Sequence, residues 1–376
     1  MRMLYLAPDP VEAPKGASVR IARTVRTLRE LGHDVELFTP PAGPLPAGNF
    51  LERMLAWRAE AAGWLAARRA DAVQFRSIWE GMPALAWARR TGARVIFEAH
   101  GFPSVELAYH FPALARQGRV LDKIIEEERR VLEGSDAVHV PSLTTARFVR
   151  RLGVEAARIH VIPNAVDPEM FSPPAAPPPD EPPFRAIYLG TLSPWQGLGA
   201  LLEALALRRG TSGVEVHVVG PLKGPWARAL RAHARALRVH HALQLSGPVA
   251  QPDVAPILRT AHVCVAPLAE DARNTLQGCC PIKLLEYMAA GRPILATRLP
   301  VVEEILEHGV TAHLVQPGSA AALADGLRWM LAHPVEREAL GARARDAVLA
   351  RWTPEHFRRR LARALAPAAA GTVSAP

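Results

Sequence analysis

Lysine is rare in this sequence. Lys and Arg together number 45 among 376 residues, but lysine occurs only at positions 15, 123, 223 and 283, so arginine carries nearly all of the net charge of +9. A basic chain can bind nucleic acid, anionic lipid or anionic small molecules. No basic block with interleaved aromatic residues occurs, so we expect no nucleic-acid partner. Against this background, a lysine inside an apolar segment is informative.

Cysteine and long apolar runs are also scarce. The three cysteines are Cys264, Cys279 and Cys280, and no C-x-x-C pair occurs, which argues against a zinc site and a redox motif. We interpret them as small buried packing residues. No apolar run approaches the ~18 residues of a membrane span. The stretch "MRMLYLAPDP" predicts a core strand rather than a signal peptide, so we expect a cytoplasmic protein.

Short apolar strands alternate with helical patterns along the whole chain. This alternation predicts an α/β protein with two parallel sheets, each covered by helices on both faces. Ligands of such doubly wound folds lie at the carboxyl ends of the strands, here most naturally between two domains. The expected strands lie at residues 3–8, 34–39, 71–77, 93–100, 136–142, 159–167, 184–190, 214–220, 243–247, 262–267, 293–297 and 312–315.

The composition changes abruptly at residues 172–183. Their sequence, "SPPAAPPPDEPP", holds seven prolines in twelve residues and is interpreted as a stiff linker. The alternative is a long surface loop inside one domain. With a linker, residues 1–171 and 184–352 form two domains, and residues 353–366 form a last helix. We expect the tail, residues 367–376, to be disordered.

One apolar segment carries two charged residues. In "GCCPIKLLEYMAAGRPILAT", a helix over residues 281–290 would place Lys283 and Glu286 three residues apart among apolar side chains. A buried carboxylate is costly unless it is paired or meets a ligand. One interpretation is an ordinary Lys–Glu pair on a solvated face. The other is that Glu286 accepts hydrogen bonds from ribose hydroxyls, while Lys283 and the helix N-terminus meet phosphate oxygens.

This segment resembles the donor-site motif of the family 4 retaining glycosyltransferases, which have the GT-B fold. The chain also carries, in the family's order, "GASVRIARTVRTLRELGHDVELFT", "FEAHG", "VIPNAVDPEMF" and "YLGTLSPWQGLGALLEAL". The resemblance implies two Rossmann-like domains that face each other across a cleft. Residues 1–171, with the crossing helix 353–366, would form the acceptor side, and residues 184–352 would bind the nucleotide-sugar donor.

The chain departs from the family pattern at two places. The second glutamate of the family's E-x7-E motif matches Glu286, but its first position falls on Gly278. The segment "PIKLLEY" instead resembles a subset of the family with Pro-x-Lys ahead of the glutamate. An arginine and a lysine that often reach the donor diphosphate are replaced by Thr191 and Gln196. We infer that Lys283 supplies the charge that those two residues would have given.

The resemblance implies that His100, Lys283 and Glu286 are catalytic. His100 would face the cleft near the reacting carbon, oriented by Glu98; the alternative is a satisfied polar loop residue. Arg273 is a further candidate cation or a solvated surface charge. The donor-binding residues that we predict are Gly16, Gly190, Thr191, Gln196, Gly197, Lys223, Pro281, Ile282, Lys283 and Glu286.

The resemblance implies a glycosyltransferase of the hexosyl type. It would move a sugar from a nucleotide-diphosphate donor to a glycan, lipid-linked or small-molecule acceptor with retention of configuration. Because no D-x-D motif occurs, we expect neither a metal nor another cofactor. The alternatives are an epimerase or phosphorylase of the same fold, and a catalytically impaired GT-B protein that binds nucleotide or partners without turnover.

A membrane contact is a separate question. Residues 51–69 carry Leu, Trp and Arg at helical spacing. Such a helix can lie on the inner face of the membrane, as a lipid-linked acceptor would require. Alternatively, it packs on its own sheet.

Overall fold

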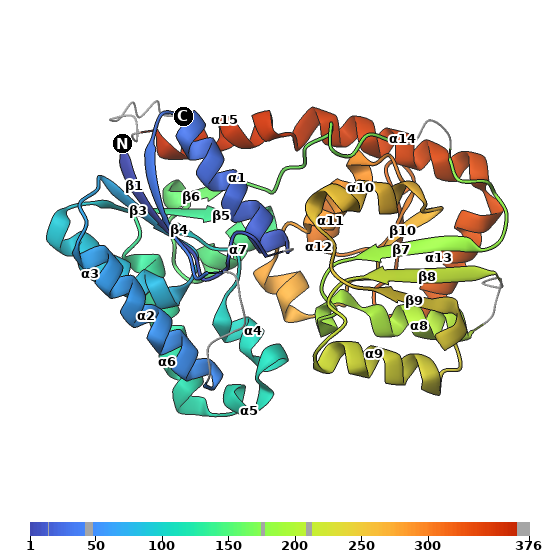
Figure 1. The fold of residues 1–376 in the computed structure, drawn as a ribbon, viewed down its shortest axis with the longest axis horizontal. Coiled ribbons are helices and arrows are strands. Elements are labelled where there is room, and N and C mark those ends of the chain that lie inside the picture. Colours follow the sequence, from blue (N-terminus) through green and yellow to red (C-terminus); the bar gives the residue numbers. More distant parts are fainter. Residues whose placement is uncertain (14, 42–47, 174–176, 208–212, 367–376) are drawn as a thin grey trace.

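Two six-stranded parallel sheets organise the chain (Figure 1). The computed structural model describes residues 1–13, 15–41, 48–173, 177–207 and 213–366. Each predicted strand segment overlaps one observed strand, although the first strand begins one residue earlier than predicted, at Arg2. The predicted α/β class is confirmed. The first sheet comprises β1 (Arg2–Leu6), β2 (Asp34–Phe38), β3 (Ala72–Phe75), β4 (Arg94–Glu98), β5 (Ala137–Val140) and β6 (Ile159–Val161). The second comprises β7 (Phe184–Leu189), β8 (Val214–Val219), β9 (Leu243–Ser246), β10 (Val263–Ala266), β11 (Ile294–Thr297) and β12 (His313–Val315).

The two sheets differ in strand order. The first runs β2-β1-β3-β4-β5-β6, which is the flavodoxin-like order. The second runs β12-β11-β10-β7-β8-β9, which is the Rossmann order. In both orders the chain reverses direction across the sheet, and a crevice opens at the carboxyl ends of the strands beside that point. We call the parts built around these sheets the N-terminal and C-terminal lobes.

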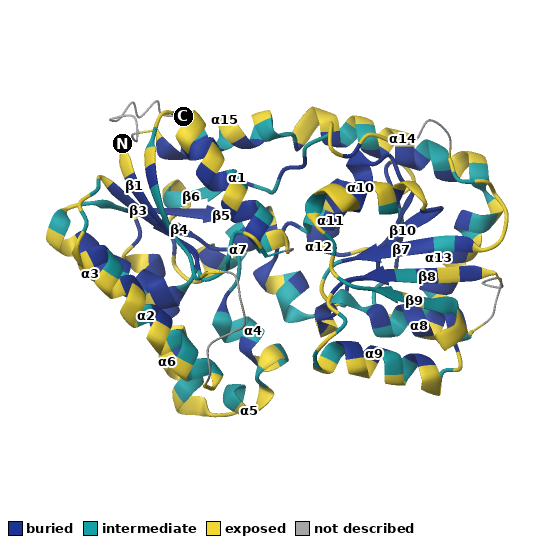
Figure 2. Cartoon of the chain, viewed as in Figure 1, coloured by how far each residue is buried: buried dark blue, intermediate teal, exposed yellow. Residues whose placement is uncertain are grey.

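Helices cover both faces of the first sheet, because side chains alternate along each strand. Met3 and Tyr5 pack in a core with α1 and α15, whereas Leu4 and Leu6 pack in a core with α2, α3 and α6. Central strands are accordingly buried on both faces (Figure 2). The helices of this lobe are α1 (Gly16–Glu30), α2 (Phe50–Ala66), α3 (Ile78–Thr91), α4 (Pro103–His110), α5 (Pro112–Ala115), α6 (Gly118–Glu133), α7 (Leu143–Arg151), the short η1 (Ala156–Arg158) and α15 (Pro354–Leu365).

The second sheet is covered in the same way. Ile187 packs in a core with α10, α11, α12 and α14, and its neighbour Tyr188 packs in the opposite core with α8, α9 and α13. The helices of this lobe are α8 (Leu198–Ala206), α9 (Pro225–Ala236), α10 (Gln251–Arg259), α11 (Ile282–Ala289), α12 (Pro300–Glu303), α13 (Ala320–Ala332) and α14 (Pro334–Arg351), with short turns η2 (Pro194–Gln196), η3 (His240–Ala242) and η4 (Arg273–Gln277).

The last helix returns to the first lobe. The red ribbon of α14 and α15 runs along the top of both sheets in Figure 1. Phe357 and Leu361 of α15 are buried in the same core as Met3 and Ile21. The exact domain boundaries stay a prediction. In the segment 172–183, the described residues belong to neither a helix nor a strand, and the tail 367–376 lies outside the described residues.

Helix α2 uses its apolar face within the protein. Trp57 is 7% exposed, and Trp57 and Trp64 each stack on Phe38 with ring centroids 4.9 Å apart. Arg58 forms an ion pair with Glu127. The apolar stripe therefore packs on its own sheet, as in the alternative to a membrane contact. No helix in the described part of the chain is long and apolar enough to cross a membrane.

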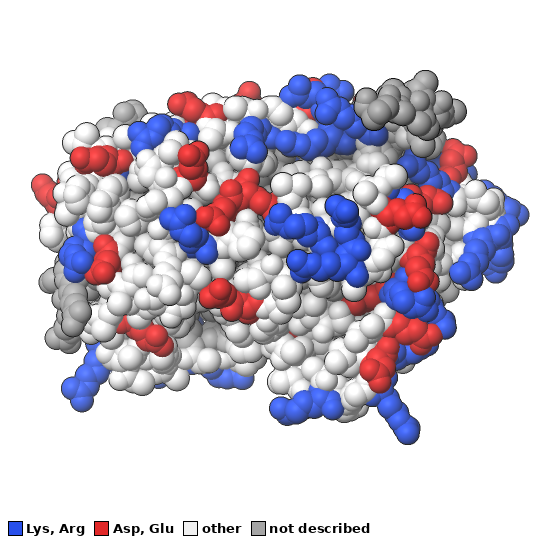
Figure 3. Space-filling model, turned by 180° about the vertical axis from the view of Figure 1, so that it is seen from behind, with Lys and Arg blue, Asp and Glu red and all other residues white. Residues whose placement is uncertain are grey.

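Charges of both signs share the surface. On the face turned away in Figure 1, basic and acidic side chains are interspersed, with basic ones grouped near the centre (Figure 3). Several arginines pair with carboxylates one helical turn away, such as Arg129 with Glu133. Local pairs of this kind offset part of the arginine charge.

Candidate active site

Three cavities lie between the lobes in the described part of the chain. The largest, of about 570 Å³, is lined by Arg23 of the N-terminal lobe and by Gln251 and Glu286 of the C-terminal lobe. The other two adjoin each other. The larger of these two, of about 420 Å³, is the cleft cavity; it is lined from the N-terminal lobe by His100 among others and from the C-terminal lobe by Gln196. The smaller, of about 130 Å³, is the side cavity, and Glu286 lines it.

Gly16 and Lys283 line both the cleft cavity and the side cavity and so mark their junction. Gly190 directly follows β7, His100 comes two residues after β4, and Gln196 lies in the η2 turn after β7. The carboxyl ends of the strands are where a doubly wound fold binds its ligand.

Glu286 lies one turn into α11 and is buried, with 6% of its surface exposed. Its Oε1 accepts a hydrogen bond from Nε2 of Gln251 at 2.8 Å. Burial raises the pKa of Glu286, against the effects of that hydrogen bond and of Lys283. Because no arginine or lysine nitrogen of the described residues lies within 4.0 Å of it, the carboxylate is not locked in an ion pair.

Lys283 reaches from α11 toward the carboxyl end of β7. Its Nζ donates to Oε1 of Gln196 at 2.7 Å and lies 3.9 Å from the centre of the Tyr188 ring. The side chain is 7% exposed, and burial lowers its pKa to about 7. Gly190, at φ +131°, leaves room for it, since a Cβ there would lie 3.0 Å from Nζ.

Thr191 and Gln196 lie beside this lysine. Gln196 donates from Nε2 to Oγ1 of Thr191 at 3.3 Å while its Oε1 accepts from Lys283. The two positions at which the family pattern has cations are therefore hydrogen-bonded in one chain that ends on the Lys283 amine. The Lys283 amine therefore lies close to the two positions whose charge it is inferred to replace.

His100 follows β4 and joins a buried network. Its Nε2 lies 2.8 Å from Oε1 of Glu98, as the predicted orienting contact requires. Burial raises the pKa of Glu98, but Arg20 and the hydrogen bond from His100 outweigh it and hold that pKa well below its usual range. Burial and repulsion from Arg76 lower the pKa of His100 to about 4. At neutral pH the pair is therefore an ionised carboxylate and a neutral imidazole.

Gly278, at the missing first glutamate, packs against the other lobe. Its φ is +80° and ψ is 167°, a region that is essentially restricted to glycine. A Cβ would lie 2.7 Å from the backbone N of Thr145 at the start of α7. No side chain fits here while the lobes are in contact, so the departure from E-x7-E is part of the interface between them.

Other predicted residues fall in different places. Pro281 is the N-cap of α11 and lines the cleft cavity together with Ile282 and Arg273. Gly197 caps α8 and lines neither cavity. Lys223 is exposed and also lines neither.

The sequence reasoning missed several residues that line or support the site. Gln251, the partner of Glu286, is the first residue of α10, and no sequence motif marks it as a site residue. Arg76 was detectable, because it directly follows the apolar strand β3 in "QFRS". Gln277 bridges the lobes by accepting from the backbone N of Phe102 at 3.1 Å and donating to Glu106 at 2.8 Å.

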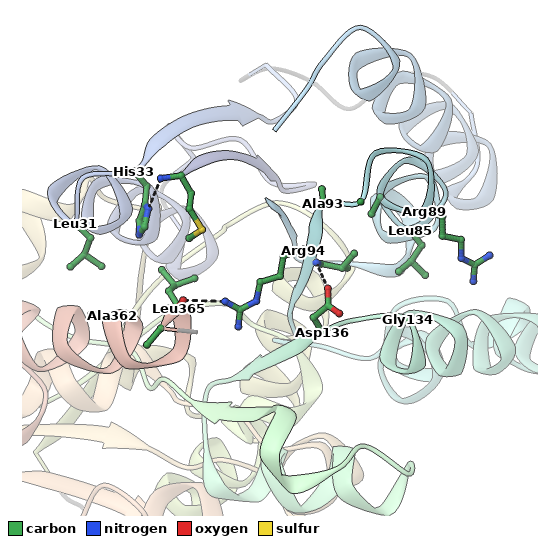
Figure 4. A pocket seen from close by; sticks show the side chains of 15 residues that line it. Leu31, His33, Leu85, Arg89, Ala93, Arg94, Gly134, Asp136, Ala362 and Leu365 are labelled. Carbon is green, nitrogen blue, oxygen red and sulfur yellow. Dashed lines mark hydrogen bonds between the residues drawn. The ribbon is translucent and has the colours of Figure 1, made fainter. Parts of the chain in front are cut away.

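A larger cavity, of about 1130 Å³, lies away from this cleft (Figure 4). Leu31, Arg94 and Asp136 line it at the amino ends of β2, β4 and β5. Arg94 donates to the carbonyl of Leu365 at 3.1 Å and so ties down the end of α15. This end of a parallel sheet does not normally bind the ligand, so size alone does not identify the site.

Comparison with known proteins places the chain in a family. Residues 14–170 match the family described as "Glycosyltransferase Family 4", and residues 183–333 match "Glycosyl transferases group 1". The "GDP-mannose-dependent alpha-(1-6)-phosphatidylinositol monomannoside mannosyltransferase" of Mycobacterium tuberculosis is 30% identical over 276 residues, which are 70% of this chain and 68% of that protein. This chain belongs to glycosyltransferase family 4.

Further relatives of this family 4 glycosyltransferase cover nearly its whole length. The "D-inositol 3-phosphate glycosyltransferase" of Pseudarthrobacter chlorophenolicus is 24% identical, over 91% of this chain and 89% of that protein. Sucrose-phosphate synthase from Thermosynechococcus elongatus superimposes with a TM-score of 0.79 at 18% identity, covering 96% and 98% of the two chains. Anabaena HepE in complex with UDP-glucose superimposes with a TM-score of 0.72 at 19% identity, covering 97% of this chain and 99% of that chain. The predicted GT-B fold is confirmed.

Proposed function

We propose that this glycosyltransferase moves a hexose from a nucleotide-diphosphate donor to an acceptor with retention of configuration and without a metal ion. The acceptor would be a glycan, a lipid-linked molecule or a small molecule. The observation that carries the proposal is the placement of Glu286 and Lys283. One short helix presents the carboxylate to the side cavity and the amine to the junction with the cleft cavity.

The order of residues along the cleft matches the order of groups in such a donor. Glu286 would accept hydrogen bonds from the ribose hydroxyls in place of the Gln251 amide. Lys283 and the N-terminal N–H groups of α11 would neutralise the diphosphate as it leaves, which is where negative charge develops. The sugar would then extend into the cleft cavity toward His100.

His100 would act on the sugar or the acceptor as a neutral group. An ionised carboxylate only accepts hydrogen bonds, so Nε2 of His100 carries the proton that Glu98 receives. Its Nδ1 is left as an acceptor for a hydroxyl. In the proposed reaction the acceptor oxygen bonds to the anomeric carbon on the face from which the diphosphate departs, and the nucleoside diphosphate takes the hydroxyl proton.

The names of two relatives suggest the kind of acceptor. One is named for a phosphatidylinositol monomannoside and another for D-inositol 3-phosphate. Both names describe phosphorylated acceptors. A lipid-linked acceptor would bring this enzyme to the inner face of the membrane, and we retain a cytoplasmic location as part of the proposal.

A donor screen tests the proposal. Nucleotide-diphosphate sugars are titrated against the native protein, Glu286→Ala and, as the control, Glu303→Ala, whose carboxylate is exposed and pairs with Arg298. We expect Glu286→Ala to weaken the best donor by ~10- to 100-fold, since hydrogen bonds to a charged group contribute about 1.5–3 kcal/mol. The thermal midpoint should be unchanged. Equal affinity in all three proteins would contradict the proposal.

The same screen addresses the non-catalytic alternative, which the glycine at position 278 keeps open. Donor that binds through Glu286 but is neither hydrolysed nor transferred to any acceptor would favour a protein that binds nucleotide without turnover. Release of nucleoside diphosphate that depends on His100 would favour the enzyme.

A further inference from the structure

Arg76 is a buried cation without an ion-pair partner. It follows β3 in the N-terminal lobe, is 8% exposed, and lines the cleft cavity but not the side cavity. Its guanidinium makes one hydrogen bond, from Nη1 to the carbonyl of Ala17 at 3.0 Å. Among the described residues no carboxylate oxygen lies within 4.0 Å of it. Four of its five N–H donors are therefore left for other partners.

Three carboxylates act on the charge of Arg76, and two of them have every acceptor position filled. Glu98 accepts from four side chains and Glu80 accepts from four donors, which fills the roughly four acceptor positions of each. Asp9, the third acid near Arg76, pairs with Lys15. The donors to Glu98 are Tyr5, Arg20, Gln74 and His100. Those to Glu80 are the backbone N–H groups of Arg76 and Ser77, the Ser77 hydroxyl and the Trp57 indole.

Burial lowers the pKa of Arg76, but Tyr5 and the charges of Glu98, Asp9 and Glu80 outweigh it and raise that pKa. None of these acids contacts the guanidinium, so its remaining N–H donors are available to an anion in the cleft cavity.

The donor diphosphate does not account for the Arg76 cation. Lys283 and Gly16, which would hold the diphosphate, lie at the junction of the two cavities, whereas Arg76 lines only the cleft cavity. A planar guanidinium with spare donors suits a phosphate, which it can contact through two parallel hydrogen bonds.

We infer that Arg76 binds a phosphate group of the acceptor, so that the acceptor substrate is a phosphate ester held in the cleft cavity against the N-terminal lobe. This inference rests on the proposed function, because it takes the α11 side of the cleft as the donor site. It narrows the acceptor from any hydroxyl compound to the phosphorylated ones, either soluble or as a lipid headgroup.

The test uses sn-glycerol 3-phosphate as the probe, glycerol as its uncharged counterpart, and saturating nucleoside diphosphate to occupy the donor site. We expect the native protein to bind the phosphate ester and not glycerol. Arg76→Gln should lower the affinity for the phosphate ester by about tenfold or more, and Arg76→Lys should recover part of that affinity. The control Arg89→Gln, an exposed arginine of the same lobe, should bind as the native protein does.

Two outcomes would overturn the inference. In the first, Arg76→Gln binds the ester normally, so that the binding is adventitious. In the second, Arg76→Gln loses the nucleoside diphosphate as Lys283→Met does, which would assign Arg76 to the donor. Failure of the proposed function would be seen in a different measurement: Glu286→Ala would bind the donor as tightly as the native protein does. Unchanged thermal midpoints establish that the variants are folded.

A vesicle arm distinguishes the two sources of phosphate. Phosphatidylcholine vesicles with and without phosphatidic acid are floated with the native protein and Arg76→Gln. Recovery that requires both phosphatidic acid and Arg76 supports a lipid-linked phosphate acceptor. Binding of the soluble ester without Arg76-dependent flotation supports a soluble one.

Discussion

Lys283 links a single side chain to the pH dependence of donor binding. Burial lowers its pKa to about 7, so the amine is charged below that pH and becomes neutral as the pH rises through it. If only the charged form holds the diphosphate, the donor dissociation constant should rise about tenfold from pH 6 to pH 8. Calorimetric titration across that range measures it. Lys283→Met should bind weakly with a flat profile, and a native profile as flat as that of the variant would exclude the role.

Restoring the family's glutamate at position 278 should harm this protein rather than improve it. Restoring the family's first glutamate with Gly278→Glu should lower stability by about 1–3 kcal/mol, because the backbone conformation is restricted to glycine and a Cβ meets the backbone of Thr145. Gly278→Ala should show most of the same loss in chemical denaturation, since the strain begins at Cβ. Donor turnover should fall in both. A Gly278→Glu variant that is stable and more active would show that the lobe interface rearranges.

Helix α7 is capped from the opposite lobe. The Glu304 carboxylate accepts from the backbone N–H groups of Leu143 and Thr144, each at 2.7 Å, and so offsets the positive end of the helix dipole. Glu304→Gln should weaken this contact, lower the free energy of unfolding by about 1 kcal/mol, and increase the radius of gyration as the lobes separate. Small-angle scattering and thermal unfolding measure both. Glu303→Gln, one residue away and exposed, serves as the control and should change neither.

Helix α15, which crosses back to the N-terminal lobe, contacts a residue that holds the His100–Glu98 pair in place. Phe357 of α15 is 1% exposed, and the Arg20 guanidinium that holds Glu98 lies 4.5 Å from its ring centre. Phe357→Ala should lower the free energy of unfolding by about 3–5 kcal/mol. It should also reduce turnover, through a less fixed Glu98. Denaturant titration measures the free energy of unfolding, and donor hydrolysis measures the turnover. As the control, Leu349→Ala changes a partly exposed residue of α14, and its free energy of unfolding should stay within about 0.5 kcal/mol of the native value.

Short apolar runs predicted the twelve strands, and helical spacing placed Lys283 and Glu286 on one helix among apolar residues. Residues on one strand or helix turn are placed by chain geometry, so the spacing of Lys283 and Glu286 already implied their common side of α11. Strand order was not accessible in this way, because the flavodoxin-like and Rossmann orders share the same alternation of strand and helix. The sequence therefore predicted the class of fold but not that the two lobes differ in topology.

Contacts between distant residues could not be read from local patterns. Gln251 meets Glu286 from another element, and Gly278 packs on Thr145 from the opposite lobe. Whether Arg76 is paired depends on which donors fill the surrounding carboxylates. Local spacing sets which side chains share an element, since covalent geometry acts over a few residues. Partners, unpaired charges and cavities arise only when the sheets and lobes pack, because they depend on approaches between residues far apart in the chain.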